Sequence, residues 1–180
     1  MGKANEEIEK KINFTVFPVY QGGPLMHVIA GKAVAFSEAL KPEFYLYCQK
    51  IISNAKHLAD TLIELDFDLV SGGTDTHVIL IDLSKNNISG KVAEIALESA
   101  GITTNKNMVP FDERSPMITS GIRIGTPALT TRGMGENEMS RIAGLIDKVI
   151  RNINDESAIS SVKNEVDELC QSFPLYENLM

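Results

Sequence analysis

One arginine lies in a short segment whose pattern could hold a carboxylate. In Gly121-Ile122-Arg123-Ile124-Gly125, the period of two of a β-strand places both isoleucines on one face and Arg123 on the other. A guanidinium is permanently charged, and its planar donors match a carboxylate at two points. A strand is also a rigid support for such a group. The pattern therefore predicts a carboxylate site at Arg123, with an arginine on a solvated sheet edge as the alternative.

Two further segments could take part in binding. The loop Asn105-Lys106-Asn107 offers side-chain amides, and Gln21-Gly22-Gly23-Pro24 precedes a run that we expect to be helical. Adjacent glycines let backbone N–H groups approach an anion closely, so Gly22 and Gly23 could bind a phosphate. A plain turn is the alternative for this glycine pair.

The residues alone supply no recognisable acid, base or nucleophile. The three histidines (His27, His57 and His77) share no metal-ligand spacing, so we expect no metal site. No serine or cysteine has a base partner near it. We expect Asp112, Glu113 and Arg114, in the loop before the arginine strand, to be solvated.

The elements that must position these residues alternate along the chain. We expect strands at 14–18, 67–70, 78–83, 102–104 and 121–125, and helices at 27–40, 42–64, 90–100, 136–153 and 156–173. Residues 105–119 are expected to be otherwise irregular. Strands interleaved with helices predict an α/β fold in which a small sheet is covered mainly on one face.

Some of these helices carry specific predictions of burial. The helix at 27–40 is apolar enough to be a buried one. The helix after Pro42 is expected to be amphipathic, with Asn54 and His57 on its solvent-exposed face. Its buried face is expected to contain Cys48, Ile51, Ile52, Ala55, Leu58, Ala59, Leu62 and Ile63. In the helix at 90–100 the inward residues are expected to be Val92, Ile95, Ala96 and Ala100.

Composition limits the classes of partner. The 180 residues are 43% hydrophobic and 23% charged, with a net charge of −7. An acidic chain without clustered Lys and Arg is a poor ligand for nucleic acid or an anionic membrane surface. Cys48 and Cys170 are expected to be small core residues in a reducing compartment. With no signal peptide or membrane span in the sequence, we expect a cytoplasmic protein.

Five segments in register resemble the carboxyl-terminal part of the serine hydroxymethyltransferase family, over nearly the whole chain to about residue 176. They are Phe17-Pro18, Gln21 to His27, Val70 to Asp75, Asn105-Lys106-Asn107 and Thr119 to Ala128. The resemblance implies the aminotransferase-type fold (fold type I) of pyridoxal-phosphate enzymes. Residues 1–26 would then be a remnant of the large cofactor-binding domain, 27–41 a linking helix, and 42–180 the small carboxyl-terminal α/β domain.

The resemblance also implies an activity and roles for single residues. The family interconverts serine plus tetrahydrofolate with glycine plus methylene-tetrahydrofolate, as a homodimer or a pair of dimers, with pyridoxal phosphate as the electron sink. By position, Arg123 would bind the substrate carboxylate, and Gly22 and Gly23 would bind the cofactor phosphate of the neighbouring subunit. The folate contacts would be Asn107, Ser115, Pro116 and Met117.

Other residues of the family's site have no counterpart in this sequence. The lysine that forms the Schiff base lies in a Thr-His-Lys context upstream of the glycine pair, and Lys10, Lys11 and Lys32 have other neighbours. We therefore expect no catalytic residue in this chain, no cofactor bound to the chain alone, and no activity. The alternatives are a non-catalytic carboxylate-binding or assembly module, or one half of an enzyme split over two chains. For a truncated chain, exposed apolar surface is expected at about 14–39.

Milder differences concern single positions. Met117 stands where the family often has an aromatic residue, Thr76 where asparagine is usual, and Tyr20 where the loop residue is usually small. They affect the details of folate contact rather than the resemblance itself.

Overall fold

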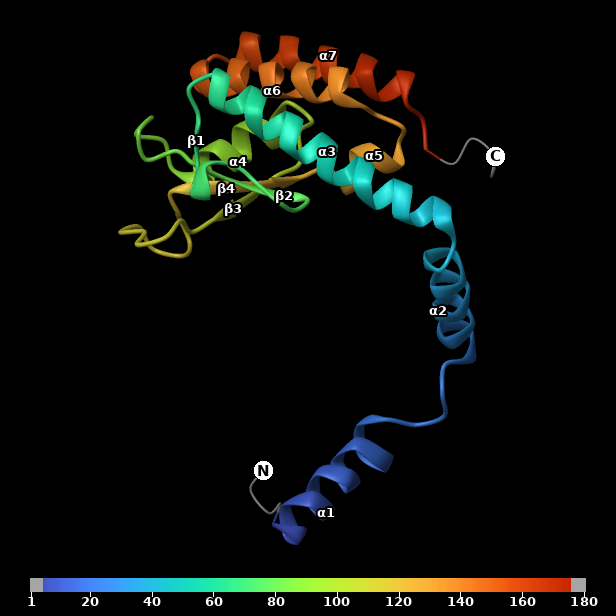
Figure 1. Cartoon of the computed structure of the whole chain (residues 1–180). Helices are drawn as coiled ribbons and strands as arrows, with labels where there is room; N and C mark the ends of the chain where they lie inside the picture. The colour runs from blue at the N-terminus through green and yellow to red at the C-terminus, as the bar shows by residue number, and fades with distance from the viewer. Residues whose placement is uncertain (1–4, 176–180) are drawn as a thin grey trace. The chain divides into compact units, whose positions relative to one another are not determined.

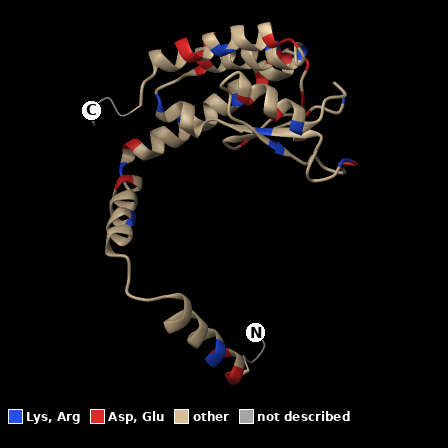
Figure 2. Cartoon of the chain, turned by 180° about the vertical axis from the view of Figure 1, so that it is seen from behind, with Lys and Arg blue, Asp and Glu red and all other residues tan. Residues whose placement is uncertain are grey.

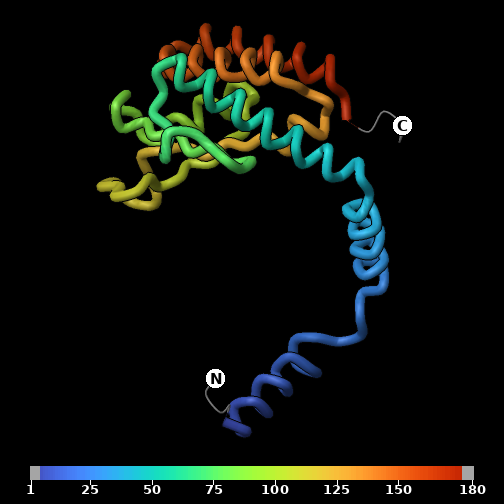
Figure 3. Tube along the Cα trace, in the orientation of Figure 1, coloured from blue at the N-terminus to red at the C-terminus, as the bar shows by residue number. Residues whose placement is uncertain are grey.

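The structure is a computed structural model that describes residues 5–175 (Figure 3). The chain forms two compact units, Met1–Phe44 and Tyr45–Met180. Each has its own secondary structure, and the long helix α3 (Pro42–Glu64) begins in the first unit and continues in the second.

In the described part of the first unit, helices are the regular secondary structure. Its elements are α1 (Glu6–Phe14), a π-helical segment (Thr15–Tyr20) and α2 (Met26–Ala39). The Asn5 side chain accepts a hydrogen bond from the Glu7 N–H at 3.0 Å and so caps α1, and the Glu7 carboxylate pairs with Lys11 at 2.8 Å. The predicted strand at 14–18 is wrong: only Phe17 is extended there (φ −139°, ψ 127°). A strand needs a partner strand, and the described part of this unit contains none.

The apolar residues of the first unit are exposed. No residue of α1 or α2 is buried, and Phe14 and Phe36 are 64% and 68% exposed. The expected apolar surface at 14–39 is therefore confirmed. The prediction that the helix at 27–40 is buried is wrong for this chain. Burial depends on which elements cover a helix, and not on its composition alone.

The second unit contains a four-stranded antiparallel sheet. Its strands are β1 (Asp68–Leu69), β2 (Val78–Asp82), β3 (Asn105–Asn107) and β4 (Gly121–Gly125), in the order β1-β2-β4-β3 (Figure 1). The strand expected at 102–104 is wrong, because the segment that pairs with β4 begins at Asn105. Register with a distant partner fixes this boundary, and local β-propensity does not.

Helices cover one face of this sheet. Besides α3 they are α4 (Gly90–Ser99), α5 (Pro127–Thr131), α6 (Glu136–Arg151) and α7 (Glu156–Ser172). Helix α4 contacts β3, β4 and both carboxyl-terminal helices, so it lies between the sheet and the α6–α7 pair (Figure 1). The side chains of Ile79, Ile81 and Ile122 are fully buried beneath the helices. The predicted one-sided α/β arrangement is confirmed.

The buried stripes of two helices differ from the prediction. In α3, Ile52 and Ile63 are 46% and 44% exposed, whereas Asn54, expected on the wet face, is fully buried. The Asn54 amide donates to the Thr130 hydroxyl and the Met134 carbonyl, each at 3.0 Å. These bonds satisfy the amide nitrogen, while the Asn54 Oδ1 is buried without a hydrogen-bond partner among the described residues.

In α4 the inward stripe is rotated from the predicted one. Val92 and Ile95 are 47% and 53% exposed, and Ala93 and Leu97 are fully buried in their place. Ala96 and Ala100 are buried as expected. Helix α4 packs against β3, β4, α6 and α7, and these contacts, not the hydrophobicity of single residues, decide which stripe is buried.

Charged residues are dispersed over the second unit. Figure 2 shows Lys and Arg interspersed with Asp and Glu along its helices and strands. Ion pairs join opposite charges on neighbouring elements, as between Lys148 on α6 and Glu165 on α7 at 2.7 Å. None of the helices in residues 5–175 combines the length and apolar character needed to cross a membrane.

Candidate functional site

Strand β4 holds Arg123 inside the sheet. The residue lies opposite Leu80 of β2 on one side and opposite Asn105 of β3 on the other. The isoleucines that flank it are fully buried (Ile122) and half-buried (Ile124) on the helix-covered face. Arg123 itself is exposed on the opposite face. The predicted alternation is confirmed, because ladder bonds on both sides prevent the strand from rotating.

The charge of Arg123 has a weak partner in the structure. Its Nη2 donates to the Asn105 side-chain oxygen at 3.5 Å, the long limit for a hydrogen bond. Within residues 5–175, no carboxylate forms an ion pair with this guanidinium. An exposed guanidinium without a counter-charge can accept an external anion, preferably a planar one that takes two donors.

Close packing around the strand accounts for the glycine at its start. A Cβ on Gly121 would lie 2.6 Å from the Ile81 carbonyl oxygen and 2.7 Å from a Val109 methyl group. At the other end, a Cβ on Gly125 would lie 3.0 Å from the His77 carbonyl oxygen. The neighbouring backbone thus occupies the space that a side chain would need, which keeps β4 close to both partner strands.

Two asparagines share the face of Arg123. Asn105 and Asn107 lie two residues apart on β3, so their side chains point the same way, and Asn107 is paired with Gly121. The Asn107 amide donates to the Met108 carbonyl at 2.7 Å. Lys106 points to the other face, where its backbone N–H and its ammonium contact Glu94 at 2.9 and 3.5 Å. The structure therefore places Asn107 beside β4, on the sheet face of Arg123.

The other predicted contacts lie on the loop before β4. Ser115, Pro116 and Met117 are all exposed, and Met117 is 72% exposed. The Ser115 carbonyl accepts from the N–H groups of Ile118 and Thr119, each at 2.9 Å, which closes a turn around these residues. The loop therefore presents an ordered apolar tip to solvent.

Asp112 organises this loop and is not merely solvated. Its carboxylate accepts from the Ser120 hydroxyl at 2.7 Å and from the backbone N–H groups of Ser120, Arg114 and Val109 at 2.8, 2.9 and 3.3 Å. The Ser120 hydroxyl, followed by these N–H groups, lowers the pKa of Asp112 to about 2. The side chain thus ties both ends of the loop to the residue that precedes β4.

The sequence contained one local signal for this role. Asp112 precedes Arg114 by two residues, a spacing at which aspartate accepts from its own backbone. The link to Ser120, eight residues away, has no such pattern.

The glycine pair lies in the first unit, between the π-helical segment and α2. A Cβ on Gly22 or Gly23 would meet nothing within 4 Å. The turn before it is closed by the Gln21 N–H, which donates to the Val16 carbonyl at 2.8 Å. In the described part of the chain, the N–H groups of both glycines lack an acceptor. Two unpaired N–H groups beside open space are suited to an anion.

No set of three or more His, Cys, Asp and Glu side chains within residues 5–175 is arranged to hold a metal ion. Cys48 and Cys170 are free thiols, each half-buried.

The sequence is similar to those of known proteins. Residues 1–146 match the family model for serine hydroxymethyltransferase. A serine hydroxymethyltransferase of Endomicrobium trichonymphae is 58% identical over 175 residues, which are 97% of this chain and 42% of that protein. One of Coxiella burnetii (strain CbuG_Q212) is 53% identical over 179 residues, 99% of this chain and 43% of that protein.

The fold and these matches define the class: the chain has an α/β fold with a small four-stranded antiparallel sheet, consistent with the small domain of fold type I enzymes. The chain belongs to the serine hydroxymethyltransferase family. It spans less than half the length of the curated relatives it matches.

Proposed function

We propose that this chain supplies the substrate-carboxylate anchor of a serine hydroxymethyltransferase, which interconverts serine plus tetrahydrofolate with glycine plus methylene-tetrahydrofolate. The observation that carries the proposal is Arg123: it is exposed, it is held by a paired strand, and within residues 5–175 its guanidinium makes one weak hydrogen bond, to Asn105 at 3.5 Å. Serine and glycine share the α-carboxylate that such a guanidinium recognises.

The role of Arg123 follows from this geometry. Two parallel N–H···O bonds fix both the position and the plane of a carboxylate, so the rest of the amino acid has a defined orientation. Because the weak bond to Asn105 is easily exchanged, anion binding costs the protein little.

Pyridoxal phosphate is the cofactor that this family implies, and the residues of the first unit fit its phosphate. Gly22 and Gly23 offer unpaired N–H groups next to open space, the donor set that binds phosphate in glycine loops. We propose that they bind the phosphate of a cofactor in the neighbouring subunit of a homodimer. When bound, the cofactor supplies an electron sink for the carbanion chemistry of the amino acid.

The folate substrate is assigned to the loop and strand beside β4. Asn107 has amide groups suited to the heterocycle of the folate, and Ser115, Pro116 and Met117 form an exposed tip against which an apolar ring can pack. The hydrogen bonds of Asp112 support this tip. The roles of these four residues follow from their positions in the family resemblance. The exposure of the loop tip and the hydrogen bonds of Asp112 support them.

We further propose that the chain alone is inactive. Its 180 residues contain no lysine in a Thr-His-Lys context. The Asp82 carboxylate, which shares the sheet face of Arg123, accepts from the Ser84 N–H at 2.8 Å. Catalysis would then require the remainder of a full-length protein.

The experiment is Arg123→Lys in a full-length enzyme that carries this segment. A lysine keeps the charge but loses the two-point geometry. We expect serine and glycine binding to weaken by about 1.5–3 kcal/mol, roughly 10- to 150-fold, with the fold retained. Arg141→Lys is the matched control, since Arg141 is an exposed arginine of α6 whose Nη2 donates to the Glu165 carbonyl at 3.4 Å. Unchanged serine affinity in Arg123→Lys would remove Arg123 from the site.

A further inference from the structure

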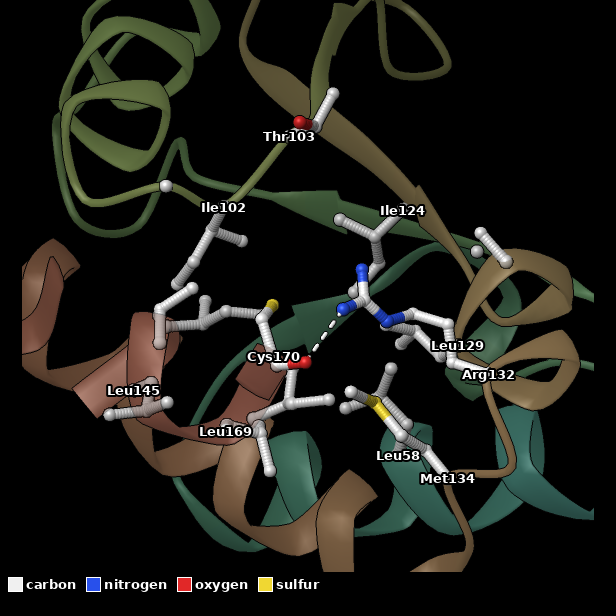
Figure 4. Close-up of a pocket in the computed structure, with 16 residues that line it drawn as sticks. Leu58, Ile102, Thr103, Ile124, Leu129, Arg132, Met134, Leu145, Leu169 and Cys170 are labelled. Atoms are coloured by element: carbon white, nitrogen blue, oxygen red, sulfur yellow. Dashed lines mark hydrogen bonds between the residues drawn. The ribbon is translucent and has the colours of Figure 1, made fainter. Parts of the chain in front are cut away.

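A cavity of about 280 Å³ lies on the helix-covered side of the second unit, away from the face of Arg123. It is bounded by α3, β4, α5, α6 and α7 and by the segment after α4. Most of its lining is aliphatic (Figure 4): the labelled side chains include Leu58, Ile102, Ile124, Leu129, Leu145 and Leu169. Such a lining favours an apolar occupant over water.

One charged residue lines this cavity. The half-buried guanidinium of Arg132 lies between Ile124 and Cys170 (Figure 4). Its Nε donates to the Phe173 carbonyl and its Nη2 to the Cys170 carbonyl, both at 2.9 Å, at the carboxyl end of α7. These bonds use two of the five N–H donors of an arginine. Three remain, including both on Nη1.

The charge of Arg132 is not neutralised by a side chain. Every other lining residue is uncharged, and Arg132 forms no ion pair in the described part of the chain. The two carbonyl dipoles stabilise the cation only partly. A half-buried cation surrounded by aliphatic side chains is stabilised further by an anion that brings its own apolar group.

We propose that this cavity binds a small monocarboxylate with an apolar tail, its carboxylate on Arg132 and its tail against Ile102, Ile124 and Leu169. An apolar cavity of about 150 Å³ is enough for benzene, so the larger volume accommodates a ring or a short alkyl chain. The site is independent of Arg123, because Ile124 and Arg123 point to opposite faces of β4.

Phenylacetate is the probe, added to the 180-residue chain with labelled Ile and Leu methyl groups. We expect saturable shifts at Ile102, Ile124 and Leu169, with a Kd on the order of 1 mM because the ligand has few atoms. Phenylacetamide, which lacks the charge, should bind at least tenfold more weakly. Equal binding of the two compounds, or shifts that do not saturate, would overturn the proposal.

Three variants separate this site from others. Arg132→Met should weaken phenylacetate binding at least tenfold. Because that change also removes bonds at the end of α7, Thr103→Phe serves as a second test: Thr103 is exposed at the rim, and a bulky side chain there should obstruct the cavity with those bonds intact. Arg123→Ala should leave binding unchanged.

Two results would contradict the proposal. Loss of binding in Arg123→Ala, with retention in Thr103→Phe, would place the ligand on the open face of the sheet. Binding that appears only after removal of residues 176–180 would show that the end of the chain occupies the cavity.

Discussion

Replacing Gly121 with alanine should destabilise the second unit, because the added methyl group has no room. Its Cβ would lie 2.6 Å from the Ile81 carbonyl oxygen and 2.7 Å from a Val109 methyl group, roughly 1 Å inside a normal contact. The oxygen belongs to the backbone of β2, so relief requires two paired strands to separate. Overpacking of this kind costs about 1–3 kcal/mol. Any shift of β4 also moves Arg123, two residues further on.

Gly144→Ala is the matched control. Gly144 lies in α6, is exposed, and its Cβ would meet nothing within 4 Å. Alanine in a helix interior is favoured over glycine by about 0.8–1.0 kcal/mol, so this variant should be more stable than the parent.

Urea unfolding followed by circular dichroism at 222 nm measures both changes, and the first unit contributes equally to all three chains. The free energy of unfolding should fall in Gly121→Ala and rise in Gly144→Ala, with unchanged m-values. A Gly121→Ala chain within 0.5 kcal/mol of the parent would refute the packing argument, and so would the same loss in both variants.

Two further predictions concern the loop and the cofactor. The pKa of Asp112 is lowered to about 2, so its contribution to stability is complete above the unfolded-state value of about 3.9 and is lost as the pH falls through about 2. Thermal unfolding should therefore show a lower Tm for Asp112→Asn at pH 6 and a smaller difference at pH 2; a constant difference would contradict the assignment of the pKa. Incubation of the chain with pyridoxal phosphate and borohydride should leave no stable adduct on one specific lysine, and mass spectrometry that finds one would refute the expected inability to hold the cofactor.

Local pattern was sufficient for the strand at the centre of the site. Once helices cover one face of the sheet, the alternation Ile122-Arg123-Ile124 requires both isoleucines on the covered face and Arg123 on the open one. The structure shows this arrangement. The amphipathic helices α6 and α7 were predictable in the same way, because Met139, Ala143, Ile146, Val162, Val166 and Leu169 repeat at the helical period and are buried.

Contacts between distant residues were not predictable from pattern. Asn54 is polar, and its spacing in α3 predicts a solvent-exposed position, yet its partners Thr130 and Met134 lie 76 and 80 residues away in sequence. The start of β3 at Asn105 depends on pairing with β4. For Asp112, the four hydrogen bonds that it accepts become visible only when the loop is closed.

The central claim is that Arg123 holds the substrate carboxylate, and a crystal structure of the full-length enzyme with bound glycine tests it most directly. We predict that both carboxylate oxygens accept from the Arg123 guanidinium at about 2.7–2.9 Å, with the Asn105 contact retained or exchanged. A glycine carboxylate held by another cation, with Arg123 still facing solvent, would contradict the account.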